Sequence, residues 1–251
     1  MTDVVWHLLL VAAGFFAGVV NTIAGGGSFL TLPALMLFGL DPKIANGTNR
    51  VAVLFSSAAA VATFDKHGLL DRKLALRLTL PTFVGVLFGA LLAIYLPTDA
   101  FEAAFGAIFL GMALLLTLNP KKLIAARKTS APSPWLVLPL FFGIGVYVGF
   151  IQAGLGILLL LGMSLLNTGD LVESNAIKNL IGFLVTLTAT IVFVVHGLVE
   201  WLPGLTMAAG NVVGGFVGAK LAIKKGNRMI FGVLVIVMVA TGIRLLASSL
   251  F

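Results

Sequence analysis

The chain has 251 residues, of which 60% are hydrophobic and 10% are charged, and its mean hydropathy is +1.14. A soluble domain carries roughly 25% charged residues, so this composition excludes water as the main solvent of the folded chain. The net charge of +7 does not indicate a nucleic-acid partner, because the basic residues lie in short loops between apolar segments. The absence of cysteine excludes disulfide bonds, thiol catalysis and thiolate metal sites.

Apolar segments recur along the whole chain. Two runs without Asp, Glu, Lys or Arg, residues 4–40 and 129–169, are far longer than the ~20 residues that cross a bilayer as a helix. Residues 180–195 are apolar on all sides, whereas the strands of a membrane β-barrel alternate apolar and polar residues. The sequence therefore predicts an all-α polytopic membrane protein. Its eight segments are residues 4–40, 51–64, 74–96, 101–118, 135–166, 177–195, 202–223 and 229–250.

The second half of the sequence resembles the first half. The motif Gly14-x-x-x-Gly18 recurs at Gly145-x-x-x-Gly149, and the same offset aligns Asn21 with Gln152, Gly25 with Gly156 and Ala45 with Ala176. With a slightly shorter offset, His67-Gly68-Leu69 recurs at His196-Gly197-Leu198, and Gly85-x-x-x-Gly89 recurs at Gly214-x-x-x-Gly218. Such self-similarity predicts two four-segment repeats. We expect residues 1–128 to form the first repeat, with a cytoplasmic linker from about residue 119, and residues 129–251 to form the second.

Glycines interrupt the first segment of each predicted repeat. These segments are longer than one crossing requires, and they contain Gly25, Gly26 and Gly27 in the first repeat and Gly154 and Gly156 in the second. The apolar residues after each interruption are too few to cross the bilayer again, because a helix rises only about 1.5 Å per residue. Each segment is therefore predicted to be a broken helix or a re-entrant hairpin.

The distribution of basic residues tests this topology, because Lys and Arg collect in cytoplasmic loops. If every segment crosses once, the two sides hold nine and seven cations, which shows no bias. If the first and fifth segments return to the side that they entered, the split becomes thirteen to three. Each repeat then makes an odd number of crossings, which predicts inverted-topology repeats of the kind found in secondary transporters, with both termini on the periplasmic side.

The glycine-rich breaks are the first predicted binding site. Irregular backbone at membrane depth survives only where protein or a wet cavity satisfies its polar groups. A short helix that begins at such a break directs its N-terminal N–H groups at the membrane interior, where they can bind an anion. The alternative is that these glycines only allow close helix packing, which is the interpretation we prefer for Gly14, Gly18, Gly85, Gly89, Gly214 and Gly218. The predicted break residues are Asn21, Thr22, Gly25, Gly26, Gly27, Ser28, Gln152, Gly154 and Gly156.

A second polar cluster follows each break, at the start of the next helix, and each cluster contains one cation. A fixed cation beside two helix N-termini suits a small oxyanion, and Arg binds one in a bidentate manner. The alternative is that both cations extend to the membrane interface. The clusters are Asn46, Thr48, Asn49 and Arg50 in the first repeat, and Asn175, Lys178 and Asn179 in the second.

Other ionisable residues and motifs give weaker indications. His67 and His196 occupy matched positions and can carry protons, although a solvated loop position is the more common explanation for such residues. Arg244 lies in the last apolar segment, seven residues from the chain end, and is predicted to extend outward. Nothing resembles His-Glu-x-x-His, Gly-x-Ser-x-Gly or a Walker loop, so we expect no enzymatic activity, no metal site and no cofactor.

The residues around the first break resemble the TauE/SafE family, also called sulfite exporters or toluene sulfonate uptake permeases. The resemblance rests on Gly14-x3-Gly18-x2-Asn21-x3-Gly25-Gly-Gly-x4-Leu32-Pro33 and on Ala45-x-Gly47-Thr48-Asn49, and it extends along essentially the whole chain. It implies a bacterial inner-membrane carrier of small sulfur-containing anions, such as sulfite or organosulfonates, coupled to an ion gradient. The second copy departs from this pattern, because it has Gln152 in place of Asn21 and fewer glycines.

Two classes of function remain open from the sequence. The first is a secondary transporter that exposes a small anionic substrate alternately to each side, with protons or another ion as coupling partner. The second is a passive anion channel or a membrane scaffold without transport. Membrane lipid surrounds the protein in both cases, nucleic acid is a partner in neither, and the sequence leaves a homodimer open.

Overall fold

A computed structural model describes residues 2–117, 134–165 and 171–248 of the chain. Within these ranges the regular structure is helical, and no strand occurs. The predicted linker after residue 119 lies outside the described residues. The helices are α1 (Thr2–Ile23), α2 (Ser28–Leu37), α3 (Pro42–Lys66), α4 (Arg72–Tyr95), α5 (Thr98–Thr117), α7 (Pro134–Phe150), α8 (Leu155–Leu165), α9 (Leu171–Val195) and α10 (Trp201–Ser248).

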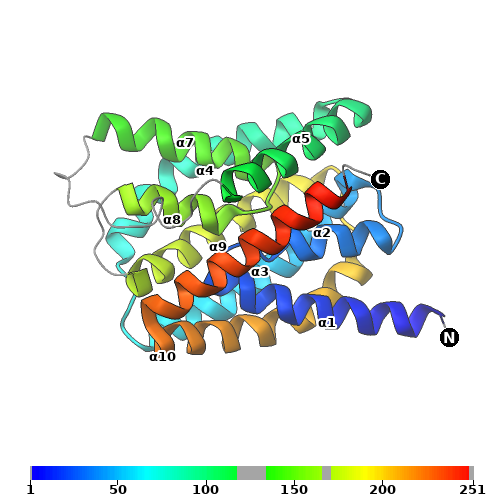
Figure 1. The fold of residues 1–251 in the computed structure, drawn as a ribbon. Coiled ribbons are helices and arrows are strands. Elements are labelled where there is room, and N and C mark those ends of the chain that lie inside the picture. Colours follow the sequence, from blue (N-terminus) through cyan, green and yellow to red (C-terminus); the bar gives the residue numbers. More distant parts are fainter. Residues whose placement is uncertain (1, 118–133, 166–170, 249–251) are drawn as a thin grey trace.

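The first repeat begins with a hairpin. α1 starts at the right-hand end of the bundle in Figure 1, and after the break α2 turns back toward that same end. α3 then runs to the opposite end, and α4 runs back from there while packing against α7 and α9. The prediction of a first segment that returns to the side it entered is confirmed, with α1 as its long arm and α2 as its short arm.

The second repeat has the same order with the opposite direction. α7 begins at the left-hand end, α8 turns back toward that end, and α9 runs to the right. α1 and α7 therefore enter the bundle from opposite ends, which is the arrangement of inverted-topology repeats. The last described helix, α10, ends at Ser248 on the side where α1 begins.

The last two predicted segments form one continuous helix. α10 extends over 48 residues, and Figure 1 shows that its first and last parts run in different directions. The residues between the predicted segments, Lys224 to Arg228, include a single glycine and no proline, and the helix is continuous through the change of direction.

Glycine faces hold the two repeats together. α1 packs along α10, and α7 packs along α4, so the first helix of each repeat lies against the fourth helix of the other. A Cβ on Gly18 would collide with the backbone of Asn211, and a Cβ on Gly149 would collide with that of Val86. Small residues allow this close approach between helices in a bilayer. The packing interpretation of the Gly-x-x-x-Gly motifs is therefore confirmed.

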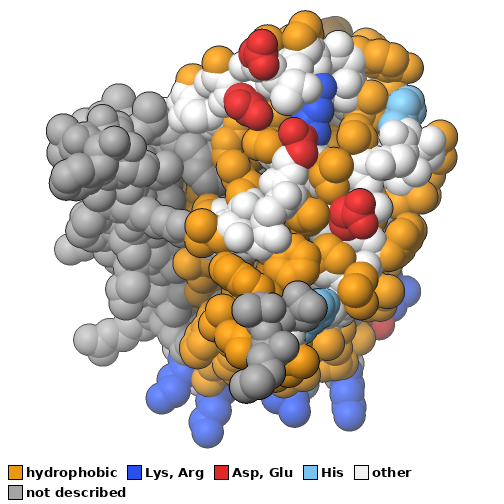
Figure 2. Space-filling model, turned by 90° about the vertical axis from the view of Figure 1, so that its right-hand side faces the viewer, with side chains coloured by type: hydrophobic (Ala, Val, Ile, Leu, Met, Phe, Trp, Pro, Cys, Tyr) orange, Lys and Arg blue, Asp and Glu red, His pale blue; other side chains and the backbone are white. Residues whose placement is uncertain are grey.

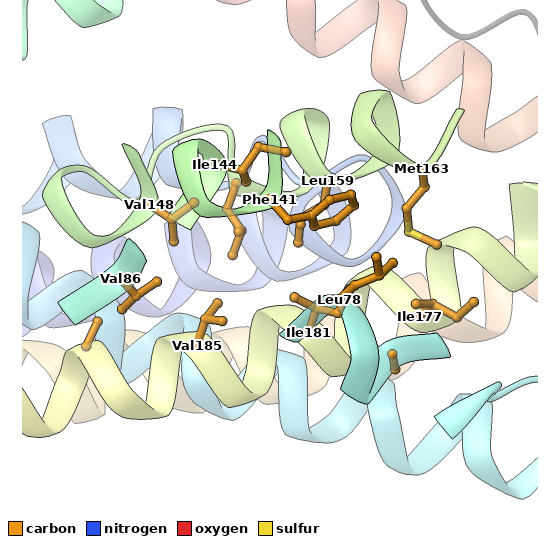
Figure 3. Close-up of a cluster of buried hydrophobic side chains, with 13 residues drawn as sticks. Leu78, Val86, Phe141, Ile144, Val148, Leu159, Met163, Ile177, Ile181 and Val185 are labelled. Atoms are coloured by element: carbon orange, nitrogen blue, oxygen red, sulfur yellow. The ribbon is translucent and has the colours of Figure 1, made fainter. Parts of the chain in front are cut away.

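Buried apolar side chains fill the space between helices of both repeats. Figure 3 shows one such cluster, in which side chains of α4, α7, α8 and α9 interdigitate. Large apolar side chains on the outer surface face lipid instead: Leu80 is 69% exposed and Trp135 is 85% exposed. The labelled side chains of the cluster are Leu78, Val86, Phe141, Ile144, Val148, Leu159, Met163, Ile177, Ile181 and Val185.

The helices have lengths that suit a bilayer. Four of the described helices are long and apolar enough to cross, namely Val4–Ile23, Arg72–Tyr95, Leu171–Val195 and Trp201–Lys225. The two returning helices, Ser28–Leu37 and Leu155–Leu165, are too short to do so. α3 has 25 residues and a lower mean hydropathy, because its buried face carries the polar cluster that starts at Asn46.

The two ends of the bundle differ in charge. We call the end where α1 begins the acidic end, because it carries Asp41, Asp99, Glu102 and Glu200 together with Lys43. Figure 2 views this end, and acidic side chains are spread across it while most visible Lys and Arg side chains project beyond its lower edge. The opposite end, which we call the basic end, carries Lys66, Arg72, Lys73, Arg77, Lys220, Lys224 and Lys225.

Candidate functional site

The two predicted breaks meet inside the bundle. Gly25 has a φ of +82° and Gly154 has a φ of +76°, a backbone conformation that favours glycine. A Cβ on Gly25 would collide with the backbone of Gly156, and a Cβ on Gly156 would collide with that of Gly25. The broken segments of the two repeats are therefore in direct backbone contact.

The end of α1 is held by residues of the other repeat. Lys178 Nζ donates to the carbonyl oxygens of Asn21 and Thr22 at 3.0 and 2.8 Å, and Asn179 Nδ2 donates to that of Thr22 at 3.2 Å. The last carbonyls of a helix have no partner within the helix and carry its negative dipole end. A cation and an amide on α9 thus satisfy carbonyls of α1.

The end of α7 is held in the same way by α3. Arg50 Nη1 donates to the carbonyl oxygen of Val148 at 3.1 Å, and Nη2 donates to that of Gly149 at 2.7 Å. Asn46 Nδ2 donates to the carbonyl oxygen of Phe150 at 2.8 Å. The third helix of each repeat therefore caps the first helix of the other repeat.

The two cations do not occupy equivalent positions. α3 and α9 have the same length, 25 residues each, so they can be aligned from their first residue to their last. This alignment pairs Arg50 with Asn179 and Lys178 with Asn49. It replaces the predicted alignment of Ala45 with Ala176, which is wrong by two positions. Where one of the two helices carries a cation, the other carries an asparagine at the aligned position.

The predicted match between Asn21 and Gln152 is also corrected. From Gly14 the helix α1 continues for nine residues to Ile23, whereas from Gly145 the helix α7 continues for five residues to Phe150. The second copy is therefore shorter by about one helical turn. As a result Asn21 lies in the helix, and Gln152 lies in the break.

Both cations are buried, which excludes the alternative that they extend to the membrane interface. Arg50 is 0% exposed and Lys178 is 3% exposed. The guanidinium carbon of Arg50 also lies 4.5 Å from the ring centroid of Phe193, within the range of a cation–π contact. Among the side chains that the structure describes, the buried set contains these two cations and no carboxylate.

A hydrogen-bonded network joins the first break to α3. Asn49 Nδ2 donates to Ser28 Oγ at 3.1 Å, and the hydroxyl of Thr31 donates to Asn49 Oδ1. Ser28 is the first residue of α2, and the N-cap residue Gly27 has no side-chain cap. Sequence reasoning missed Thr31, although a threonine one turn after Ser28 on a short apolar helix is a signal of a shared polar face.

The second break is held by two further residues that sequence reasoning missed. Gln152 Nε2 donates to Thr186 Oγ1 at 2.7 Å, and the Tyr147 hydroxyl donates to the carbonyl oxygen of Ala153 at 2.7 Å. Thr186 lies in the apolar part of α9, which contains several threonines, and nothing in the sequence distinguishes it from the others as a site residue.

Five predicted site residues carry a buried polar atom without a hydrogen-bond partner among the described residues. Buried polar groups in native proteins nearly always have a partner, and leaving one without costs about 1–3 kcal/mol. These atoms are concentrated around the two breaks. The atoms are Thr22 Oγ1, Asn46 Oδ1, Arg50 Nε, Gln152 Oε1 and Asn175 Nδ2.

Not every predicted residue belongs to this centre. Thr48 Oγ1 accepts from the backbone N–H of Glu200 at 2.9 Å, so its side chain fixes the loop between α9 and α10. Gly27 packs against α1, since a Cβ there would collide with the carbonyl oxygen of Ala17. Gly26 makes a local contact only: its carbonyl oxygen accepts a hydrogen bond from the Phe29 N–H at 3.1 Å, at the start of α2.

The matched histidines lie at helix ends. His67 Nδ1 lies 2.8 Å from the carbonyl oxygen of Thr63, and His196 Nδ1 lies 2.8 Å from that of Val192. Both are exposed, which agrees with the loop interpretation. The side chain of Arg244 lies outside the described residues. Within the described part of the chain, no group of three or more His, Asp or Glu residues is placed to hold a metal ion.

The fold and the buried site define a class of protein: a multi-pass membrane protein with inverted repeats and a polar centre where two broken helices meet, the plan of secondary transporters. A sequence model of the family described as "Sulfite exporter TauE/SafE" matches residues 10–245. The chain therefore belongs to the TauE/SafE family of membrane transporters.

Curated relatives agree with this assignment. The chain is 34% identical to the probable membrane transporter protein ORF9 of Sinorhizobium sp, over 99% of this chain and 96% of that protein. It is 30% identical to the probable membrane transporter protein YfcA of Escherichia coli K12, over 96% of this chain and 91% of that protein. No solved structure matches the chain. The protein is thus a bacterial inner-membrane transporter and not an enzyme.

Proposed function

We propose that this transporter carries small sulfur-containing anions, such as sulfite and organosulfonates, across the bacterial inner membrane. The family description supports the substrate class. The observation that carries the proposal is the buried centre with Arg50, Lys178 and no carboxylate among the described buried side chains. Two buried cations without a counter-charge are unfavourable, and a bound anion removes this cost.

The centre offers hydrogen-bond donors that match an oxyanion. Arg50 Nε and Asn175 Nδ2 are buried donors without a partner among the described residues, and the Thr22 hydroxyl can donate as well. The N-termini of α2 and α8 begin at the breaks and add a positive dipole end from each repeat. Charge-assisted donors of this kind bind sulfonate oxygens as they bind carboxylate or phosphate oxygens.

The packing suggests which parts move during alternating access. The repeats of residues 1–128 and 129–251 interlock, because α1 packs along α10 and α7 packs along α4. Backbones in such close glycine contact move together. The moving units are therefore the α1–α10 pair and the α4–α7 pair, and their separation opens the contact between Gly25 and Gly156 from one side at a time.

The basic end is proposed to face the cytoplasm, as the positive-inside rule requires. At this end Lys66 is the last residue of α3, and Arg72 and Lys73 are the first two residues of α4. The acidic end, with the start of α1 and the end of α10, then faces the periplasm.

The function is tested by ligand binding and flux of the purified full-length protein. A ligand that binds the folded state raises the unfolding temperature by mass action, so sulfite, thiosulfate, sulfoacetate and methanesulfonate are compared with sodium chloride at equal ionic strength. In proteoliposomes loaded with a stabilising anion, we expect counterflow of the labelled anion. Flux without counterflow identifies a channel, and absence of both binding and flux identifies a scaffold; either result rejects the proposal.

A further inference from the structure

Lys178 lies where the two breaks meet. Its Nζ donates to the carbonyl oxygens of Asn21 and Thr22, at the end of α1. Its stem lies against the other break, since a Cβ on Gly156 would be 2.9 Å from Lys178 Cδ. One lysine side chain thus contacts the broken segments of both repeats.

The helices around Lys178 bring no buried negative charge to it. α3 contributes the buried cation Arg50, and α7 contributes Tyr147, whose hydroxyl is bonded to the carbonyl oxygen of Ala153. α8 has no titratable residue, and α1 carries Asp3 and His7 only in its first turns. At the basic end, where α9 begins, the titratable residues whose burial the structure describes are exposed. They are Glu173 on α9, Asp65 and Lys66 on α3, His67 after α3, Asp71 before α4, Arg72, Lys73 and Arg77 on α4, and Lys220, Lys224 and Lys225 on α10.

The two buried cations differ in one chemical property. A guanidinium stays protonated in proteins, whereas a buried ammonium can release its proton. Arg50 therefore keeps its charge throughout a transport cycle, and Lys178 can exist in a charged and a neutral form. A charged Lys178 without a carboxylate favours a bound anion, and a bound anion favours the charged form by the same free energy.

On the basis of the proposed anion transport, we propose that Lys178 carries the coupling proton. The anion binds only when Lys178 is protonated, and the two cross together as a neutral pair. After the anion leaves, the proton passes from Nζ to water on the open side, and the electron pair stays on the nitrogen. The empty carrier returns with a neutral amine, so one proton accompanies each monovalent anion.

Methanesulfonate is the probe that tests this proposal, because it stays a monoanion across the accessible pH range. Calorimetric binding to the full-length protein is measured between about pH 5.5 and 9.5. Uptake of one proton per anion predicts a loss of affinity of about tenfold per pH unit above the lysine transition. An affinity that stays constant across this range overturns the proposal.

Two substitutions separate proton coupling from anion binding. Lys178→Arg keeps a cation that cannot deprotonate, so we expect anion binding and counterflow that do not change with pH, whatever their absolute level, and no uphill accumulation under an inward proton gradient. Lys224→Arg makes the same change at an exposed site of α10 and is expected to behave as the unsubstituted protein.

The outcomes distinguish this inference from the proposed function. Gradient-driven accumulation by Lys178→Arg rejects Lys178 as the proton carrier while the anion site stands. Absence of methanesulfonate binding at every pH rejects the anion site itself. If Lys178→Arg does not fold, the pH dependence of the unsubstituted protein decides.

Discussion

Arg50 Nη2 lies 2.7 Å from the carbonyl oxygen of Gly149, 99 residues further along the chain. This bond and its partner to Val148 join α3 of the first repeat to the end of α7 in the second. Both Nη atoms of the guanidinium therefore bond backbone carbonyls, whereas its Nε has no partner among the described residues. Arg50 thus holds the end of α7 and keeps one N–H donor that the proposed anion can use.

We expect Arg50→Ala to destabilise the protein. It leaves the carbonyls of Val148 and Gly149 buried without these partners, at about 1–3 kcal/mol each. Thermal unfolding in detergent measures the loss. Arg72→Ala, which removes an exposed ion pair with Asp65, serves as the control and is expected to leave the unfolding temperature nearly unchanged. Equal effects of the two substitutions would contradict the role of Arg50.

Arg50→Lys is the sharper test of anion recognition. The charge is kept, but a lysine at this position lacks the separate Nη1, Nη2 and Nε donors, of which the first two bond carbonyls and the third has no partner among the described residues. We expect a folded protein that binds methanesulfonate about tenfold to a hundredfold more weakly, as loss of one charge-assisted hydrogen bond predicts. Isothermal calorimetry gives the affinity, and an unchanged value would place the anion elsewhere.

Gly25→Ala is predicted to disrupt the contact between the breaks. The substitution combines an unfavourable φ of +82° with a collision against Gly156, for which we expect about 1–3 kcal/mol of destabilisation. Gly106→Ala in α5 is the matched control, because a Cβ there meets nothing within 4 Å. Circular dichroism during heating compares them. A Gly25→Ala protein as stable as the control would show that the breaks separate freely.

Thr186→Val tests the positioning of Gln152. Valine has nearly the same shape, but it removes the oxygen that accepts from Gln152 Nε2 at 2.7 Å. We expect weaker anion binding and a modest loss of stability, of about 1–3 kcal/mol. Thr188→Val removes a hydroxyl that bonds the carbonyl oxygen of Leu184 in its own helix, so anion affinity should be kept. Both affinities are measured with the same anion.

The orientation of the protein is open to direct labelling, because the sequence contains no native cysteine. Lys66→Cys and Glu102→Cys place single exposed thiols at the basic and acidic ends. In intact spheroplasts, a membrane-impermeant maleimide should label Glu102→Cys at once and Lys66→Cys only after permeabilisation. The reverse pattern would invert the proposed orientation.

Local signals in the sequence predicted much of the fold. Glycines at Gly25 and Gly154 marked the breaks because positive φ favours that residue, and the uneven placement of basic residues predicted the returning segments. The paired Gly-x-x-x-Gly motifs predicted close packing, although their partners across the repeats became visible only in the structure.

The caps could not be predicted from the sequence. The partners of Arg50 and Lys178 are backbone carbonyls, which every residue possesses, so no residue type marks them. The same holds for Tyr147, whose partner is the carbonyl of Ala153. The one-turn difference between α1 and α7 also shifted the alignment at the break, which is why Asn21 was matched with Gln152.

The exchange of caps means that neither repeat is complete by itself. A membrane-inserted chain of residues 1–128 would contain α1 without Lys178 and Asn179, and a chain of residues 129–251 would contain α7 without Arg50 and Asn46. A single-repeat protein of this design satisfies its helix ends only by pairing with an oppositely inserted copy. The present chain joins two such repeats and thus preserves the geometry of an antiparallel dimer. Because the repeats are now separate parts of one sequence, one can carry Arg50 and the other Lys178.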